Sequence, residues 1–325
     1  MFSVLNTQYL VLFSLFTAHH SRSHAMILIA GCNGHVGREI VKKAIARQVP
    51  ARCFDITPCD LSGYDASRCE VMTGDITDPA AVRRAVQGVN KVLFVIGRKR
   101  GTKTLTHDMV EHGGMKNVIQ AAQESGVDHI LYISALGVGS DVPATSLRAK
   151  WNAEQCLIKS GIAYTIFRPS GYFVDFAEEF APKISQTGTF TIIGHGRYRL
   201  QPLDPADLAE AFLQALELPA ARNRIIKIAG PEIFTLLEII ELVSRVVGRP
   251  VKVKKIPLWL GNLMFSIIAR ASGNPSVKDF LYRMSRDSVC SEEELRELRE
   301  IFSIEFQRLE PWLREHVAAT CCTQP

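Results

Sequence analysis

The sequence lacks the features that mark membrane-spanning, disulfide-stapled or nucleic-acid-binding proteins. No run of about 18 apolar residues occurs in the 325-residue chain, so a bilayer-spanning helix is not expected. The eight cysteines are too sparse for a disulfide framework and form no Cys-x-x-Cys pair, which indicates free thiols in a reducing compartment. Thirty-eight Lys and Arg side chains against 33 Asp and Glu leave a net charge of +5, too small to predict nucleic-acid binding.

The composition is that of an ordinary globular protein. Hydrophobic residues make up 47% and charged residues 22%, which excludes wholesale disorder. From Met26 onward, short β-branched runs alternate with segments of helical period. Strands are expected at 26–31, 51–55, 69–73, 91–97, 129–134, 164–168 and 224–230, and helices at 35–48, 79–88, 105–125, 146–160 and 205–218. This alternation predicts a doubly wound parallel sheet, a Rossmann-type α/β fold.

The chain divides into four expected parts. Residues 1–25 hold an apolar stretch that no Lys or Arg precedes, so they lack the positive region of a signal peptide. Three interpretations of this segment stay open: an upstream extension or misassigned start, a membrane-surface anchor, and a true signal peptide. We expect a protein that starts at Met26 to fold and to bind its ligand. Residues 26–230 are expected to form the Rossmann domain, with substrate-cleft segments near 170–200. A small, mostly helical cap is expected at 231–317, followed by a tail at 318–325.

The strongest local motif is MILIAGCNGHVGREIV at residues 26–41. Gly31, Gly34 and Gly37 fall between the expected first strand and first helix. Glycines there permit a tight turn and close approach of the backbone to a pyrophosphate, and the helix start offers free N–H groups. The motif therefore predicts a dinucleotide site, with a merely tight turn as the alternative. The other loop residues expected to contact the dinucleotide are Asn33, His35 and Val36.

Three later positions extend this predicted site. Asp55 ends the second strand, 18 positions after Gly37, where a carboxylate accepts hydrogen bonds from ribose hydroxyls and repels a 2′-phosphate. No Arg follows it directly, so NAD(H) is favoured over NADP(H). Asp75 is expected near the adenine amino group, with Ile76 beside the ring. Gly97 opens a basic loop, residues 97–101. This loop is expected either to contact a cofactor phosphate, an acidic substrate or a partner, or to be a run of charged residues in solvent.

Longer segments connect the chain with a known family. They are GCNGHVG (31–37), GDITDP (74–79), NVIQAAQESGVDHILYIS (117–134), YTIFRPSGYF (164–173) and RLQPLDPADLAEA (199–211). On these segments the chain resembles the atypical branch of the short-chain dehydrogenase/reductase superfamily, which includes NmrA-like proteins and the accessory nucleotide-binding subunit of respiratory complex I. The resemblance implies an NAD(P)-dependent oxidoreductase, located in the cytoplasm, that transfers hydride between nicotinamide and a small or lipophilic organic substrate.

The same resemblance leaves the catalytic apparatus incomplete. Typical members use a Tyr-x-x-x-Lys pair and a serine; here Ser134 ends the fifth strand and Lys150 occupies the lysine position. The tyrosine position holds Ser146, whose hydroxyl cannot serve as the same proton donor. Lys150 is expected to bind the nicotinamide ribose or to donate a proton itself, unless it is a solvated helix lysine. Tyr172 is the second candidate for the proton donor. Its alternative role is that of an aromatic residue that only packs against its neighbours.

The missing tyrosine supports a second hypothesis. The chain could be a non-catalytic NAD(P)H-binding sensor, or a factor in assembly or quinone biosynthesis. The partner expected under the first hypothesis is a small-molecule substrate, and the sequence does not indicate an oligomeric state.

Two further segments bear on ligands and location. His107 and His112 lie five apart on an expected helix, off the spacing for a shared metal, so they are interpreted as surface or helix-end residues and no metal site is expected. In residues 251–268, three lysines precede the apolar stretch IPLWLGNLMFSII. This segment either lies in a membrane interface and admits a lipophilic substrate, or lines a substrate lid.

Overall fold

A computed structural model of the protein describes residues 26–97, 102, 104–274, 277 and 279–321. The extension 1–25, the basic residues 98–101 and the end of the tail, 322–325, lie outside the described residues. In the described part of the chain, no helix combines the length and the apolar character needed to cross a bilayer.

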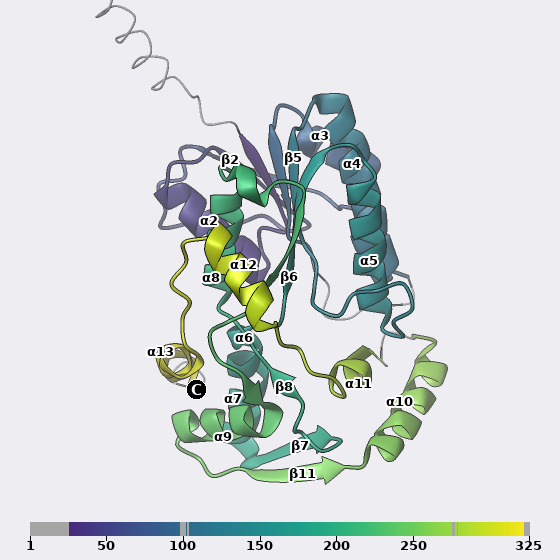
Figure 1. Ribbon diagram of the computed structural model, residues 1–325, viewed down its shortest axis with the longest axis vertical. Helices are drawn as coiled ribbons and strands as arrows, with labels where there is room; N and C mark the ends of the chain where they lie inside the picture. The colour runs from purple at the N-terminus through teal and green to yellow at the C-terminus, as the bar shows by residue number, and fades with distance from the viewer. Residues whose placement is uncertain (1–25, 98–101, 103, 275–276, 278, 322–325) are drawn as a thin grey trace, which may run out of the picture.

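Seven parallel strands form the main sheet, in the order β3-β2-β1-β4-β5-β6-β9 (Figure 1). They are β1 (Ile27–Ala30), β2 (Ala51–Asp55), β3 (Cys69–Thr73), β4 (Lys91–Phe94), β5 (His129–Ile133), β6 (Ala163–Pro169) and β9 (Arg224–Ile228). Every residue of β1 and β5 is buried, as expected when both faces of a parallel sheet are covered. The predicted Rossmann-type fold is confirmed. Because the strand order reverses between β1 and β4, the carboxyl ends of these strands border the crevice where such sheets bind ligands.

Helices cover the two faces of the sheet in separate groups (Figure 1). One group is α2 (His35–Ala46), α8 (Pro205–Ala215) and α12 (Glu292–Ile301), whose apolar residues share a single core cluster. The other is α3 (Pro79–Val86), α4 (Gly114–Ser125) and α5 (Thr145–Ile158), which share a second cluster. Helix α12 therefore packs on the sheet itself, although it lies within residues 231–317, where a cap was expected.

The helix expected at 105–125 is not regular. Met109–Gly113 form a π-helix, η1, which runs into α4 and packs against α5. A π-turn alters which side chains face the neighbouring helix, and such turns are frequent at functional sites. Glu111 is 1% exposed in this turn. His107 is a helix-end residue, as one of the two interpretations had it, because it begins this helical segment. It is not a surface residue, since packing leaves it 3% exposed.

The region below the sheet in Figure 1 is built from segments on both sides of β9. Its elements are α6 (Phe173–Asp175), η2 (Phe176–Phe180), α7 (Ala181–Thr187), β7 (Thr189–Ile193), β8 (Arg199–Leu200), β10 (Phe234–Thr235), α9 (Leu236–Val247), β11 (Lys252–Ile256) and α13 (Leu309–Cys321). Their apolar residues form a third core cluster, to which β8, β10 and β11 contribute only partly buried side chains. Within it, α9 packs against both α7 and α13. β11 pairs with β7 in parallel and β10 with β8 antiparallel, so the cap carries two small sheets beside its helices.

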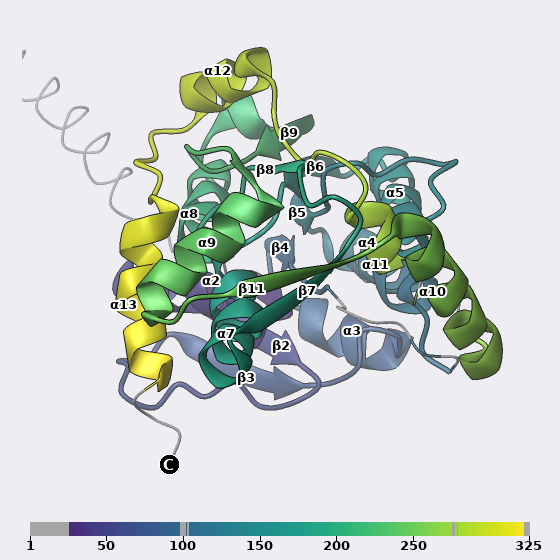
Figure 2. The same cartoon turned by 90° about the horizontal axis from the view of Figure 1, so that it is seen from below.

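Two helices and one short turn complete the fold. α10 (Leu258–Ser272) and α11 (Asp279–Arg283) follow β11, and a 3-10 turn, η3 (Pro219–Ala221), precedes β9. Figure 2, seen from below, places α10 at the outer edge of the molecule, beyond the end of β11.

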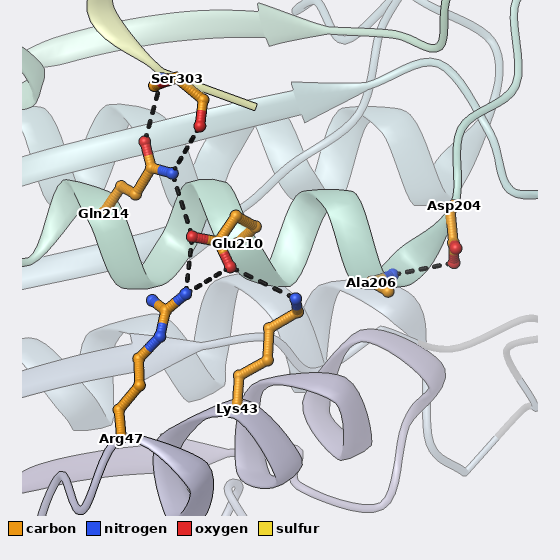
Figure 3. Close-up of polar contacts among 7 residues, drawn as sticks. All are labelled: Lys43, Arg47, Asp204, Ala206, Glu210, Gln214 and Ser303. Atoms are coloured by element: carbon orange, nitrogen blue, oxygen red, sulfur yellow. Dashed lines mark hydrogen bonds and ion pairs between the residues drawn. The ribbon is translucent and has the colours of Figure 1, made fainter. Parts of the chain in front are cut away.

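Glu210 of α8 joins three distant parts of the chain (Figure 3). Its carboxylate accepts hydrogen bonds from Arg47 at 2.6 Å and Lys43 at 3.3 Å, at the end of α2. It also accepts one from Gln214 at 3.0 Å, whose amide exchanges hydrogen bonds with the backbone of Ser303. The contact ties the first crossover helix to the segment that follows α12.

Candidate dinucleotide-binding site

The glycine loop has a backbone that other residues could not adopt. Gly31 has φ +98°, and a Cβ there would lie 2.9 Å from the backbone nitrogen of Ile96. At Gly37 a Cβ would lie 2.0 Å from the carbonyl oxygen of Gly31, so α2 can begin this close to β1 only with glycine. Both requirements arise from packing of the loop against itself and against β4.

The start of α2 is suited to an anion. Gly34 is its N-cap and supplies no side-chain cap, and the first turn carries no acidic side chain. The first N–H groups of a helix have no partner within it, and they carry the positive end of the helix dipole. The N–H groups of His35, Val36 and Gly37 are therefore available to a diphosphate, so the residues present fit a dinucleotide. The His35 ring lies 3.4 Å from Glu178 of η2, which brings the cap against this loop.

Asp55 is tied directly to the glycine loop. One carboxylate oxygen accepts the N–H of Asn33 at 3.0 Å, and the other accepts that of Ile56 at 2.8 Å. The Asn33 side chain in turn donates to the carbonyl and hydroxyl oxygens of Thr57, both at 2.9 Å. Each Asp55 oxygen keeps a further lone pair, so the carboxylate can still accept from a ribose hydroxyl. Asn33 and Asp55, which were expected in one site, lie together in the structure.

Asp75 and Ile76 occupy different environments. Asp75 is exposed, and its carboxylate accepts hydrogen bonds from the N–H and hydroxyl of Thr77, both at 2.8 Å. Ile76 is 5% exposed and packs where α4 begins at Gly114, which leaves little of its side chain for a ligand. Gly97 is exposed beyond the end of β4, with open space around its Cα.

Lys150 lies in a buried polar cluster. Its ammonium group contacts both oxygens of Glu111, at 3.0 and 3.1 Å, and donates to the carbonyl oxygen of Ile133 at 3.0 Å. The Tyr132 hydroxyl donates to the same Glu111 carboxylate at 3.0 Å. Burial, together with the Glu111 charge, raises the pKa of Tyr132 well above its ordinary value. The alternative of a solvated helix lysine is therefore wrong, because the Lys150 side chain is 11% exposed and its ammonium group contacts Glu111 and Ile133.

Ser146, which stands where the tyrosine was expected, has a structural role. It is the second residue of α5, and its N–H donates to Asp279 of α11 at 2.8 Å. The same carboxylate accepts the N–H of Thr145, and Arg283 of α11 donates to the Ser146 hydroxyl at 3.4 Å. A segment more than 130 residues away thus caps the helix that carries Lys150.

Ser134 and Tyr172 lie at the carboxyl end of the sheet. Ser134 follows directly on Ile133, and among the described residues its buried hydroxyl has no hydrogen-bond partner. Tyr172 is half-buried after β6. Burial and the charges of Asp175 and Glu111 raise its pKa well above the ordinary value, against a lowering effect of Arg283. Tyr172 is therefore a weaker acid than a free phenol, although its hydroxyl can still donate a hydrogen bond.

A family model described as NAD(P)H-binding matches residues 31–217, more than half of the chain. The chain belongs to this NAD(P)H-binding family. The predicted membership of the atypical, NmrA-like branch of the short-chain superfamily is confirmed. The match covers the glycine loop, Asp55 and Lys150.

Relatives of this NAD(P)H-binding protein have diverse functions. It is 26% identical to the photosystem II assembly factor Ycf39 of Trieres chinensis over 78% of this chain and 79% of that one. It is 27% identical to an NAD(P)H azoreductase of Xenophilus azovorans, over 72% and 78%. Its fold matches the NADPH complex of the quinone oxidoreductase QOR2 from Escherichia coli with a TM-score of 0.71, 22% identity and coverage of 89% and 99%.

Sequence reasoning missed Glu111 and Tyr132 in this NAD(P)H-binding protein. A signal for Glu111 existed, because it falls on the same helical stripe as the buried residues Met115 and Val118. A carboxylate at such a position needs a buried partner. Tyr132 had no comparable signal, since an aromatic residue inside an apolar strand is ordinary. No group of three or more His, Cys, Asp and Glu side chains in the described residues is arranged to hold a metal ion.

Proposed function

We propose that the protein is an NAD(P)H-dependent reductase that transfers hydride to a small or lipophilic organic acceptor of the quinone or azo class. The observation that carries this proposal is the buried Lys150, whose ammonium group donates to the carbonyl oxygen of Ile133, the residue before Ser134. Among the described residues the Ser134 hydroxyl has no hydrogen-bond partner of its own. The azoreductase relative and the quinone oxidoreductase fold match support the choice of acceptor class. We place the reaction in the cytoplasm, where nicotinamide dinucleotides are abundant.

The bound nicotinamide supplies the hydride, and the protein supplies binding and orientation. Gly31, Gly34 and Gly37, with the N–H groups that follow them, would hold the pyrophosphate. Asp55 would hold the adenosine ribose, Asp75 the adenine, and Lys150 the nicotinamide ribose. Asn33 would keep Asp55 in position, and Gly97 would leave room for the nicotinamide end.

The catalytic groups of this proposal are Ser134, Lys150 and Tyr172. The Ser134 hydroxyl would donate a hydrogen bond to the acceptor oxygen or nitrogen, and the Lys150 ammonium would stabilise the negative charge that hydride transfer leaves on the acceptor. A quinone delocalises that charge over its ring, so its reduction demands less of a proton donor than the reduction of an isolated ketone. This explains why a chain with Ser146 at the tyrosine position can still be a reductase. Tyr172 stays the reserve proton donor.

Substrate-dependent oxidation of NADH tests the proposal. We expect turnover with members of a quinone and azo panel, and a loss of about a hundredfold in kcat/KM for Lys150→Ala. The matched control is Lys159→Ala, a lysine at the other end of the same helix, which should leave kcat/KM unchanged. Tight NADH binding without turnover across the whole panel contradicts the reductase.

The preference for NAD(H) over NADP(H) is a separate proposal. It is supported by the Asp55 carboxylate, which would repel a 2′-phosphate. Fluorescence titration should show NADH binding at least about tenfold more tightly than NADPH, since one unfavourable charge contact is worth about 1.4 kcal/mol or more. Asp55→Asn should narrow the difference, and a clear NADPH preference of the unaltered protein would refute the assignment.

A second candidate function is a non-catalytic NAD(P)H-binding protein that senses redox state or acts in assembly or quinone biosynthesis. Ser146 favours it, because this residue belongs to the first turn of α5, which Asp279 caps, at the position where a catalytic tyrosine was expected. The similarity to an assembly factor also supports it. Binding of NADH without turnover, together with a conformational change on binding, would favour this candidate over the first.

A further inference from the structure

The helix α10 exposes a large apolar surface. Trp259, Leu263 and Ile267 recur every four residues and are 68%, 52% and 60% exposed. Met264 and Ile268 form the adjacent row, 41% and 45% exposed. Residues four apart lie on the same face of a helix, so these five side chains form one continuous surface, called here the α10 patch.

The packing of α10 does not explain this surface. Of its 15 residues only Gly261 is buried, where a Cβ would lie 2.4 Å from the Ile193 side chain. On another side, Phe265 stacks on Phe280 with ring centroids 6.0 Å apart. The helix holds six of the twelve large apolar side chains that are exposed in the described residues, although it is 15 residues long. A contiguous apolar patch of this kind marks an interaction site.

The segment of the chain that carries the patch has charge of one sign. Between Leu242 and Lys278 the sequence contains seven Lys and Arg residues and no Asp or Glu. Lys252, Lys254 and Lys255 of β11, the strand that leads into α10, are all exposed. Among the described residues, none of these three ammonium groups has a carboxylate within 4.0 Å. The surface that would cover the patch is therefore anionic at its rim.

We propose that the α10 patch inserts into the interface of an anionic phospholipid bilayer, with the β11 lysines over the headgroups. An apolar helix face with Trp and flanking lysines is the combination that interfacial helices use. A second copy of the chain fits poorly, because a symmetric contact would bring the two basic strands together. Figures 1 and 2 place α10 at the edge of the molecule, where a flat surface can reach it.

The patch is linked to the proposed reductase site through α11. α11 begins seven residues after α10 ends, and its Asp279 and Arg283 contact the start of the helix that carries Lys150. With the proposed reductase function, a lipophilic acceptor would enter from the bilayer beside α10. Only this consequence rests on the proposed function. Vesicle binding by itself needs no turnover, so it fails or holds independently of that function.

Vesicle binding by the full-length chain is the experiment. Sedimentation with phosphatidylcholine vesicles, with and without phosphatidylglycerol, should show binding only when the anionic lipid is present. The double variant Leu263→Glu/Ile267→Glu should lose binding at least about tenfold, because it buries two charges in place of two apolar side chains. The matched control is Ile233→Glu, an exposed apolar residue outside α10, which should bind as the unaltered protein does. Unchanged thermal unfolding of each variant shows that the fold is retained.

Two further measurements identify the surface. Bilayers with brominated acyl chains should quench the fluorescence of Trp259, and this quenching should disappear in Trp259→Ala while Trp151 and Trp312 remain. Each neutralised lysine, as in Lys252→Gln, should weaken binding about fivefold, and added salt should weaken it further. The control for the loss of one positive charge is Lys116→Gln on α4, which should bind vesicles as the unaltered protein does.

Three results would overturn the proposal. Equal binding to neutral and anionic vesicles would remove the role of the lysines. Binding that survives Leu263→Glu/Ile267→Glu would assign the contact to another part of the chain, such as the apolar stretch within residues 1–25. Self-association that the double variant abolishes, without any vesicle binding, would assign the patch to a protein contact.

Discussion

Lys150 is the residue whose environment says most about this protein. Its ammonium group is held by the Glu111 carboxylate and the Ile133 carbonyl oxygen, in a site that also holds the Tyr132 hydroxyl. A buried charge is stable only when it is paired and hydrogen-bonded, so the three elements that supply these groups position one another. The ammonium group is thus fixed at the carboxyl end of β5, against the residue that precedes Ser134, before any ligand binds.

The first prediction at this scale concerns Glu111. Glu111→Gln keeps an acceptor for Tyr132 but leaves the Lys150 charge without a counter-charge. Removing one partner of a buried pair costs about 3 kcal/mol of unfolding free energy, measured by urea denaturation. Glu124→Gln is the control, because its pair with Arg83 is largely exposed and its loss should leave the unfolding free energy nearly unchanged. Equal losses in both variants would mean that the cluster is not a tightly coupled site.

The second prediction for a single residue concerns His129, which is fully buried at the start of β5. Burial, with the charges of Arg222 and Lys91, lowers its pKa from 6.5 to about 4. The unfolded chain therefore takes up a proton at a higher pH than the folded one, and stability is lost as the pH falls from about 6.5 to about 4. The loss should reach about 3 kcal/mol at pH 4.

His129→Gln should remove this part of the pH dependence, as followed by urea denaturation at each pH. The exposed His195→Gln should leave it in place. An identical pH profile for His129→Gln and the unaltered protein would contradict the assignment.

At the scale of elements, the start of α5 is capped by tertiary structure. Its N-cap residue, Ala144, has no side-chain acceptor, and Asp279 of α11 accepts the N–H groups of Thr145 and Ser146 instead. A five-residue helix such as α11 is unstable alone, because so few residues cannot offset the cost of nucleating a helix. The cap therefore stabilises both elements together.

Asp279→Ala should lower the unfolding free energy by about 1–2 kcal/mol, the range for loss of an N-cap. Hydrogen exchange should become faster at the start of α5 and in α11. Asp279→Asn, which keeps a hydrogen-bond acceptor, should lower the unfolding free energy less than Asp279→Ala does. Asp287→Ala is the control, because Asp287 pairs with Arg199 at the surface. A uniform increase of exchange over the whole chain would argue against a local cap.

At the scale of the whole molecule, Glu210 holds together segments from the beginning, the middle and the end of the chain (Figure 3). Burial acts to raise its pKa, but the hydrogen bonds from Arg47, Gln214 and Lys43 prevail and lower it to about 2. The stabilisation is present above the ordinary pKa of 4.5 and is lost as the pH falls from there towards 2.

Glu210→Gln should therefore lower the unfolding free energy by about 2 kcal/mol at pH 7, allowing for partial exposure of the carboxylate. The difference from the unaltered protein should shrink steadily below pH 4.5 in urea denaturation. Glu217→Gln is the control, since that side chain is exposed and lies 3.4 Å from Lys91. A difference that stays constant down to pH 2 would show that the lost contact is not ionic.

The expectations that the structure reproduced rest on local chemistry. All seven strands of the main sheet were predicted within a few residues, because buried parallel strands are short apolar runs and the helices between them repeat every 3.6 residues. The conformations of Gly31 and Gly37 were equally readable, since only glycine tolerates the backbone contacts there. The place of Asp55 at the end of β2 was readable for the same reason.

The rest depended on residues that meet only when the chain folds. The Glu111–Lys150 pair, the Asp279 cap and the Glu210 contacts join positions 39, 134 and 167 apart, and no local pattern specifies such partners. The sequence by itself determined where the strands, helices and glycine turn lie, because those depend on neighbouring residues. Only the tertiary structure decided that Lys150 is buried, that Ser146 is a capped helix start and that the apolar face of α10 stays exposed, because burial and pairing depend on packing between distant segments.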